Sequence, residues 1–381
     1  MTPEPEWRVI GQSVRGASHV RGGLPNQDAI LWWPPSQHGP PSILVVSDGH
    51  GSEKSFRSQI GSRLAVETTV SLMRELLAGQ PTPWNLSIVK RTAEDRLPQE
   101  MVRGWQVAVD DHLSAHPFTE GELAKLEQKR GARGLKEVLD NPRLAYGATL
   151  LAALVTPEFL LFLQLGDGDI LTVLGNGDVE RPLPRDARLI ANETTSLCMP
   201  RAWREVQLRF QARYGDVPAL ILLATDGYAN SFVNESAFLK VGSDLLSILR
   251  DDGSEAVSDN LPAWLRDASE AGSGDDISLG ILYRADVAGS ADAASADAAT
   301  ACAAVDDAAG AGDQAREAGV VAIATPVAEA PAGADEIDDA ELRSRIVARI
   351  KQKGPTEPSK RGRLADIVGS DGDETHAGDN G

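Results

Sequence analysis

An apolar run ends in a polar cluster in the stretch Ile43-Leu44-Val45-Val46-Ser47-Asp48-Gly49-His50-Gly51. The run is long enough for a buried strand, and its end places a carboxylate, a turn glycine and an imidazole close together. This combination suits a metal site. The alternative is an ordinary turn, because glycine adopts positive φ and aspartate hydrogen-bonds to its own backbone.

Three more clusters of acidic residues and glycine lie at the ends of apolar runs. They are Gly166-Asp167-Gly168-Asp169, Asp226-Gly227 and Gly274-Asp275-Asp276. Each cluster alone is typical of a turn, but four of them beside apolar strands are interpreted as one constellation.

Composition excludes several classes of protein. The chain has 381 residues, a formal net charge of −19 and two cysteines. An acidic chain has no bulk attraction to a phosphate backbone, so nucleic-acid binding is disfavoured. Two cysteines make no disulfide framework, the N-terminus lacks the regions of a signal peptide, and the most apolar stretch, 150–165, is short and interrupted by Pro157. These features predict a cytoplasmic protein without a membrane partner.

The composition also changes along the chain. Residues 285–334 are rich in Ala and Asp and lack aromatic residues, which predicts a disordered linker. We therefore expect one domain over residues 1–284 and a polar tail over 335–381. The tail is acidic and then basic around 335–351, which suits a short helix. It is either a marginal solvated helix or a peptide that folds on docking to a partner.

The periodicity of apolar residues predicts the order of elements. Strands are expected over 7–14, 28–33, 42–47, 148–155, 159–165, 170–174, 206–210, 219–224 and 277–283. Helices are expected over 56–77, 84–116, 237–250 and 256–268. Strands and helices are segregated more than they alternate, which favours an α+β fold with antiparallel sheets flanked by helices.

The residue types of the clusters point to a particular chemistry. Aspartates without cysteine and with little histidine select Mg²⁺ or Mn²⁺ over zinc. Two such ions about 3.5 to 4 Å apart polarise phosphate oxygens and provide a bridging hydroxide near neutral pH. His50 could then protonate the leaving alkoxide.

Six motifs together resemble the metal-dependent Ser/Thr protein phosphatases of the 2C class, the PPM family. These motifs are Asn26-Gln27-Asp28, Val46-Ser47-Asp48-Gly49-His50-Gly51, Tyr146-Gly147-Ala148-Thr149, Leu165-Gly166-Asp167-Gly168-Asp169, Ala224-Thr225-Asp226-Gly227 and Gly274-Asp275-Asp276-Ile277-Ser278. The resemblance covers residues 7–284 and implies a four-layer αββα sandwich, with two Mg²⁺ or Mn²⁺ ions between the sheets.

The resemblance also implies a set of metal ligands. Asp48 corresponds to the carboxylate that bridges both ions, and Gly49 to the residue that provides its carbonyl oxygen. Asp226 and Asp275 correspond to ligands of one ion, while Asp28 corresponds to the residue that holds waters of the other.

Two further positions have implied roles. His50 corresponds to the proposed general acid, although a plain loop residue is the alternative. Asp167 lies where some family members bind a third metal ion. Since Asn230 replaces an aspartate that is frequent in the family, a third ion should bind weakly or not at all.

One expected residue is missing. The family commonly has a phosphate-binding arginine five residues before Asp28, where this chain has Gly23, and the same departure is found in a bacterial subgroup. His19 and Arg21 are the candidate substitutes, and both could equally be solvated loop residues. The basic residues of 125–136 are interpreted as a solvated helix face, with substrate docking as the alternative.

Two functions are compatible with these observations. The first is hydrolysis of phosphoserine or phosphothreonine in a phosphoprotein substrate, opposing a cognate Ser/Thr kinase. The second is a regulatory or binding module that keeps the fold and has little or no turnover. The intact set of ligand positions favours the enzyme, and the missing arginine favours the module.

Overall fold

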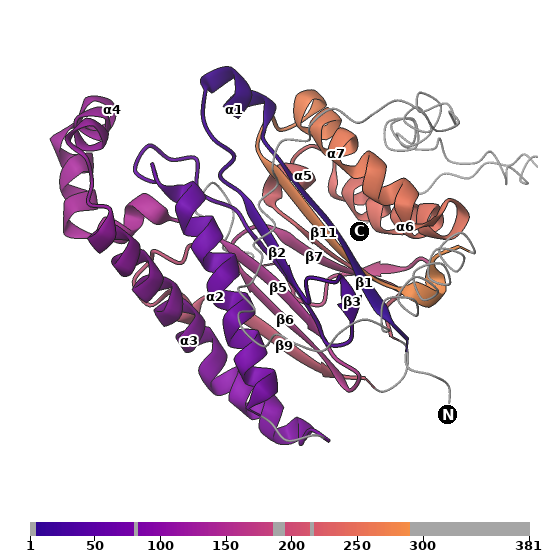
Figure 1. The fold of residues 1–381 in the computed structure, drawn as a ribbon. Helices are drawn as coiled ribbons and strands as arrows, with labels where there is room; N and C mark the ends of the chain where they lie inside the picture. Colours follow the sequence, from indigo (N-terminus) through magenta and orange to yellow (C-terminus); the bar gives the residue numbers. More distant parts are fainter. Residues whose placement is uncertain (1–4, 80–82, 186–194, 214–216, 290–381) are drawn as a thin grey trace, which may run out of the picture.

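The structure, a computed structural model, describes residues 5–79, 83–185, 195–213 and 217–289. Two antiparallel sheets lie between layers of helices (Figure 1). The predicted polar tail, 335–381, and all of the predicted linker beyond Gly289 lie outside the described residues.

Each sheet is antiparallel throughout. The six-stranded sheet has the order β3-β1-β11-β10-β7-β8, formed by β1 (Trp7–Val14), β3 (His38–Gly39), β7 (Asp169–Val173), β8 (Val179–Glu180), β10 (Leu220–Ala224) and β11 (Ile277–Arg284). The five-stranded sheet has the order β2-β4-β5-β6-β9, formed by β2 (Ala29–Trp33), β4 (Ser42–Ser47), β5 (Leu150–Val155), β6 (Phe159–Leu165) and β9 (Gln207–Ala212).

The helices form two outer layers. The described α-helices are α1 (Ala17–Gly22), α2 (Ser58–Ala78), α3 (Leu86–Ala115), α4 (Glu120–Asp140), α5 (Asp226–Ala229), α6 (Glu235–Asp251) and α7 (Gly253–Ala271). Short 3-10 helices cover Pro142–Tyr146, Ala202–Arg204 and Ala285–Val287. Helices α2 and α3 cover the five-stranded sheet, and α6 and α7 cover the six-stranded sheet (Figure 1). None of the described helices combines the length and the apolar character needed to cross a membrane.

Strand periodicity explains why there are three separate hydrophobic layers. Successive side chains of a strand point to opposite faces of its sheet. In β4, Ile43 and Val45 therefore pack under α2 and α3, while Leu44 and Val46 pack against the other sheet. In β11, Leu279 packs under α6 and α7, on the outer face of the six-stranded sheet. These three interfaces hold the four layers together.

The predicted α+β sandwich is confirmed, and each predicted strand and helix is found within three residues of its predicted ends. Elements α1, α4, α5, β3 and β8 had not been predicted. Helix α4 was missed because it buries few apolar side chains and because Gly131, at φ 69°, interrupts its helical backbone. The described fold also continues past residue 284, since the Ala285 amide donates to Glu6 O and the Gly289 amide donates to Leu249 O, each at 2.9 Å.

Candidate metal centre

Strand pairing brings the predicted carboxylates to one edge of the sandwich. In the five-stranded sheet, Ala29 of β2 pairs with Ser47 of β4, so Asp28 and Asp48 are neighbours at the same edge. In the six-stranded sheet, Ala224 of β10 pairs with Leu279 of β11, which places Asp226 and Asp275 at one edge in the same way.

A hydrogen bond links the edges of the two sheets. Thr225, which follows β10, donates its hydroxyl to Oδ2 of Asp28 at 2.8 Å. The Thr225 hydroxyl in turn accepts the Ser278 amide at 2.9 Å. Carboxylates from both sheets therefore face one site, as a metal centre between the sheets requires.

The segment after β4 is held by its neighbour β5. The Asp48 amide donates to Oγ1 of Thr149, and the Thr149 amide donates to the Asp48 carbonyl at 2.8 Å. Gly49 is tightly enclosed, since a Cβ there would collide with the Gln27 carbonyl and lie 2.8 Å from the Ser58 carbonyl. Only glycine fits this position, so the backbone of Gly49 stays available for the role implied by the resemblance.

The electrostatics of the site favour a cation. Burial and the neighbouring carboxylates raise the pKa of Asp28 and that of Asp48 well above their usual range. Burial, followed by the charge of Asp167, raises the pKa of Asp226 to about 6. Mutual repulsion of this kind is relieved by a divalent cation, which oxygen ligands bind well. The residues present thus fit the Mg²⁺ or Mn²⁺ site predicted from the sequence.

His50 lies beside this cluster. Its amide donates to the Gly147 carbonyl at 3.0 Å, and a Cβ on Gly147 would lie 2.7 Å from Cδ2 of the imidazole. Burial lowers the pKa of His50, and the charge of Asp167 opposes this shift. The imidazole is therefore buried where it feels the charge of Asp167.

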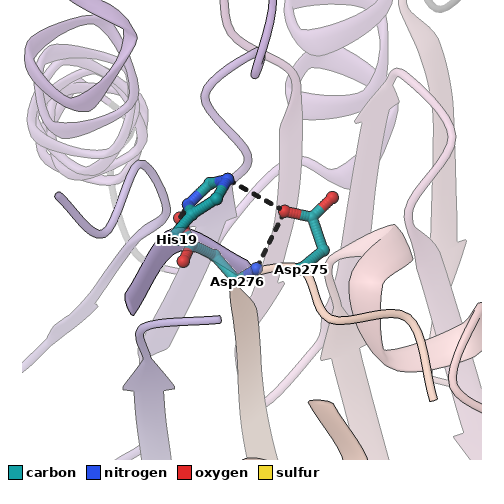
Figure 2. Close-up of side chains that lie close together, drawn as sticks. All are labelled: His19, Asp275 and Asp276. Atoms are coloured by element: carbon teal, nitrogen blue, oxygen red, sulfur yellow. Dashed lines mark hydrogen bonds and ion pairs between the residues drawn. The ribbon is translucent and has the colours of Figure 1, made fainter. Parts of the chain in front are cut away.

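Asp275 and Asp276 are adjacent in sequence but have different environments (Figure 2). Asp276 is buried and accepts the backbone amides of Gly16 and Gln27, each at 2.6 Å, together with Nδ1 of His19 at 2.8 Å. The side chain of Asp275 is 52% exposed, so it remains accessible to an ion. Sequence reasoning assigned no role to Asp276, because its donors lie about 250 residues away in the chain.

The two candidate phosphate ligands also differ. His19 is buried, with its ring facing Asp276 and Asp275, and ligand atoms of these three residues lie within 4.8 Å of one another. Arg21 is exposed, and among the described residues its side chain makes no hydrogen bond or ion pair. Its Nη2 lies 3.9 Å from the position a Cβ would take on Gly274, directly beside Asp275. The geometry favours Arg21 over His19 as the cation that reaches a phosphate.

Most of the basic residues on α4 have acidic partners. Ion pairs join Arg130 to Glu53 at 2.7 Å, Arg133 to Glu137 at 3.1 Å and Lys136 to Asp140 at 2.6 Å. These pairs favour a solvated helix face over a docking surface for an acidic segment.

Asn230 is a second supporting residue near the site. Its Nδ2 donates to Oδ2 of Asp226 at 3.0 Å and thereby orients that carboxylate. An ionised aspartate at this position could not donate this hydrogen bond, which explains why asparagine suits position 230.

Comparison with known proteins shows the family of this chain. The model of the family described as protein phosphatase 2C matches residues 15–266, and the chain belongs to this family. Among curated proteins, it is similar to serine/threonine-protein phosphatase 3 of Escherichia coli (strain K12), with 28% identity over 192 residues. The match spans 49% of this chain and 61% of that protein, or about three fifths of the relative's length.

Solved structures are similar at lower identity. The catalytic domain of the serine threonine protein phosphatase PstP, in complex with two manganese ions, has 18% identity and a TM-score of 0.44 and covers 73% of this chain and 98% of its own. The serine/threonine phosphatase Stp1 from Staphylococcus aureus has 13% identity and a TM-score of 0.44, with 72% of this chain and 94% of its own covered.

Proposed function

We propose that this protein is a metal-dependent phosphatase that hydrolyses phosphoserine and phosphothreonine in proteins. The observation that carries the proposal is the convergence of Asp28 and Asp48 from one sheet with Asp226 and Asp275 from the other. Their raised pKa values mark a site that is short of positive charge. Membership of the protein phosphatase 2C family supports the same reaction.

Two Mn²⁺ or Mg²⁺ ions would be held by Asp48, the Gly49 carbonyl, Asp226 and Asp275, with Asp28 holding waters of one ion. When bound, such ions supply a water of lowered pKa and polarise the phosphate oxygens. Asp167, near both Asp226 and His50, is the candidate ligand of a weak third ion.

The remaining roles fall to two side chains. His50 transfers a proton to the leaving oxygen of serine or threonine, for which an imidazole beside the site is suited. Arg21 binds the substrate phosphate, because its guanidinium has no partner among the described residues and can donate two parallel hydrogen bonds to phosphate oxygens.

The substrate class follows from this chemistry. A phosphoprotein modified by a cognate Ser/Thr kinase is the expected partner, and the cytoplasm is the expected compartment. A regulatory module with little turnover is the alternative function, favoured by the glycine at position 23.

The proposal is tested with p-nitrophenyl phosphate and a phosphothreonine peptide, each with Mn²⁺ and with EDTA. Hydrolysis should require the metal and should fall by about 100-fold or more in Asp48→Asn, because the site loses a negative ligand. Asp251→Asn is the matched control, since Asp251 is an exposed aspartate at the end of α6. Full turnover of Asp48→Asn at low Mn²⁺ would contradict the metal assignment, whereas tight Mn²⁺ binding without turnover would favour the regulatory module.

A further inference from the structure

One buried carboxylate fastens a complete segment of chain beside the metal centre. Asp276 accepts the Gly16 amide on Oδ1, and it accepts the Gln27 amide and His19 Nδ1 on Oδ2. Gly16 directly precedes α1 and Gln27 directly precedes Asp28. The segment 16–27 is therefore hydrogen-bonded to the Asp276 side chain at its first residue, within α1 and at its last residue.

The start of this segment is fixed by further contacts. The Ala17 amide donates to Oγ of Ser269 at 3.0 Å, and the Ser18 amide donates to the Gly274 carbonyl at 2.8 Å. A Cβ on Gly16 would collide with the backbone of Asp275, so the segment lies directly on the peptide that carries this metal ligand.

His19 is the side chain in the segment that reaches both aspartates. Since an ionised carboxylate only accepts hydrogen bonds, the 2.8 Å contact makes Nδ1 of His19 the donor to Asp276. The opposite ring nitrogen, Nε2, lies 3.5 Å from Oδ1 of Asp275 (Figure 2). Oδ1 of Asp275 also accepts the Asp276 amide at 2.9 Å. Asp275 therefore has one oxygen fixed by its surroundings and the other free for a ligand.

We propose that His19 is a positioning residue that orients Asp275 for the metal ion and holds α1 in place, without touching metal or phosphate itself. The proposal rests on the metal centre of the proposed function. It separates two residues of one short helix, because His19 acts through Asp275 and Asp276 while Arg21 faces solvent. Partners that orient metal ligands commonly change metal affinity by about 10- to 100-fold when they are removed.

Substitution by asparagine separates the two contacts of His19. The amide nitrogen of asparagine can occupy the place of Nδ1 and keep the bond to Asp276, but no atom replaces Nε2 beside Asp275. We expect His19→Asn to keep the melting temperature of the wild type and to lose about tenfold in Mn²⁺ affinity, measured by calorimetry without substrate. His38→Ala is the matched control, because His38 is an exposed histidine that pairs with Glu6 on the surface.

Two results would overturn the proposal. The first is wild-type Mn²⁺ affinity in folded His19→Asn, which would leave the ring without influence on Asp275. The second is a directly coordinated imidazole nitrogen in the pulsed electron paramagnetic resonance of bound Mn²⁺ that disappears in His19→Asn, which would make His19 a ligand. If His19→Asn does not fold, the Mn²⁺ affinity of His19→Gln is measured instead. The glutamine amide reaches toward Asp275 in place of Nε2, so the affinity should stay near that of the wild type, and a tenfold loss would contradict the proposal.

A further measurement separates His19 from Arg21. Arg21→Ala should leave Mn²⁺ affinity unchanged, because its side chain is exposed and has no hydrogen bond or ion pair among the described residues. Equal loss of Mn²⁺ affinity in Arg21→Ala and His19→Asn would contradict the separate roles. These titrations contain no substrate, so they remain decisive even if the protein hydrolyses no phosphoester.

Discussion

At the scale of single residues, two pairs of nearby residues near the site each contain one buried and one exposed side chain. Asp276 accepts three donors, whereas the Asp275 carboxylate is half exposed and accepts only the Asp276 amide among the described residues, although the two are neighbours in the sequence. His19 and Arg21 differ in the same way. Gly23 ends α1 with φ 67°, a backbone conformation that strains any residue with a Cβ. An arginine at position 23 is thus disfavoured by this local structure, and the proposed phosphate ligand, Arg21, lies two residues earlier.

Replacing Arg21 should weaken phosphate binding. We expect Arg21→Ala to lower kcat/KM about tenfold, which corresponds to about 1.4 kcal/mol of lost transition-state stabilisation. Arg21→Lys should recover part of this loss, since lysine keeps the charge without the two parallel hydrogen bonds. Steady-state kinetics with a phosphothreonine peptide measure both effects. Identical kinetics in wild type and both variants would show that the phosphate is bound without this side chain.

At the scale of elements, one arginine joins α4 to several neighbouring parts of the chain. Arg57, just before α2, is buried and donates to both carboxylate oxygens of Glu122 on α4, at 2.7 and 2.8 Å. It also donates to the carbonyls of His116 and Pro117 and to the Tyr146 hydroxyl at 2.8 Å. The contact therefore joins α2, the α3–α4 turn and the chain that leads to Gly147.

This ion pair should make stability depend on pH. Hydrogen bonding to Arg57 is the main cause that lowers the pKa of Glu122 from 4.5 to about 2. Because the folded pKa lies below the unfolded one, the stabilisation is complete above about pH 4.5 and is lost as the pH falls through about 2. Glu122 is partly exposed, so we expect a benefit of only about 1 kcal/mol after solvent screening.

Urea unfolding of wild type and Glu122→Gln at several pH values measures this benefit. The difference in the free energy of unfolding should be largest at pH 6 and should shrink toward pH 3. A difference that does not change with pH would mean that the carboxylate charge does not hold α4.

At the scale of the whole molecule, the hydrophobic layer between the two sheets sets how closely they approach. Gly280 of β11 lies against Leu44 of β4, where a Cβ would be 2.7 Å from Cδ2 of the leucine. This close approach brings the edge that carries Asp275 toward the edge that carries Asp48. Packing inside the sandwich is thereby connected to the geometry of the site.

Adding a methyl group at this contact should separate the sheets. We expect Gly280→Ala to destabilise the protein by about 1 to 3 kcal/mol, the usual cost of overpacking a core. Gly121→Ala is the control, since Gly121 lies in α4 with open space around it and should gain about 0.4 to 1 kcal/mol. Thermal unfolding compares the two variants, and equal melting temperatures would contradict the close contact between the sheets.

Truncation tests where the domain ends. A chain that stops at Gly289 should keep the melting temperature, because the Ala-rich segment after it has too few apolar residues to complete a core. A chain that stops at Arg284 should melt lower, since it loses the hydrogen bonds of Ala285 to Glu6 and of Gly289 to Leu249. Differential scanning calorimetry distinguishes the two end points, and a large loss in the longer chain would show that the tail packs on the domain.

Sequence alone determined the sandwich and the carboxylates at its edge, because both depend on local signals. Runs of consecutive apolar residues mark strands that are buried on both faces, and aspartate with glycine marks the strand ends. The recurrence of these clusters, together with the resemblance to the 2C-class phosphatases, predicted that Asp48, Asp226 and Asp275 belong to one site, and the strand pairing places them at the edges of the two sheets.

Only the tertiary structure decided how the residues around that site divide their roles. Three hydrogen-bonded pairs are separated by 65 to 257 residues in the sequence, so no local pattern could predict them: Arg57 with Glu122, Thr225 with Asp28, and His19 with Asp276. His19 and Arg21 lie two positions apart on one short helix, and the sequence offered both as phosphate ligands, with Arg21 preferred only because it is always charged. The buried carboxylate of Asp276 binds one of them and leaves the other facing solvent, because a buried charge must find its donors wherever the fold brings them.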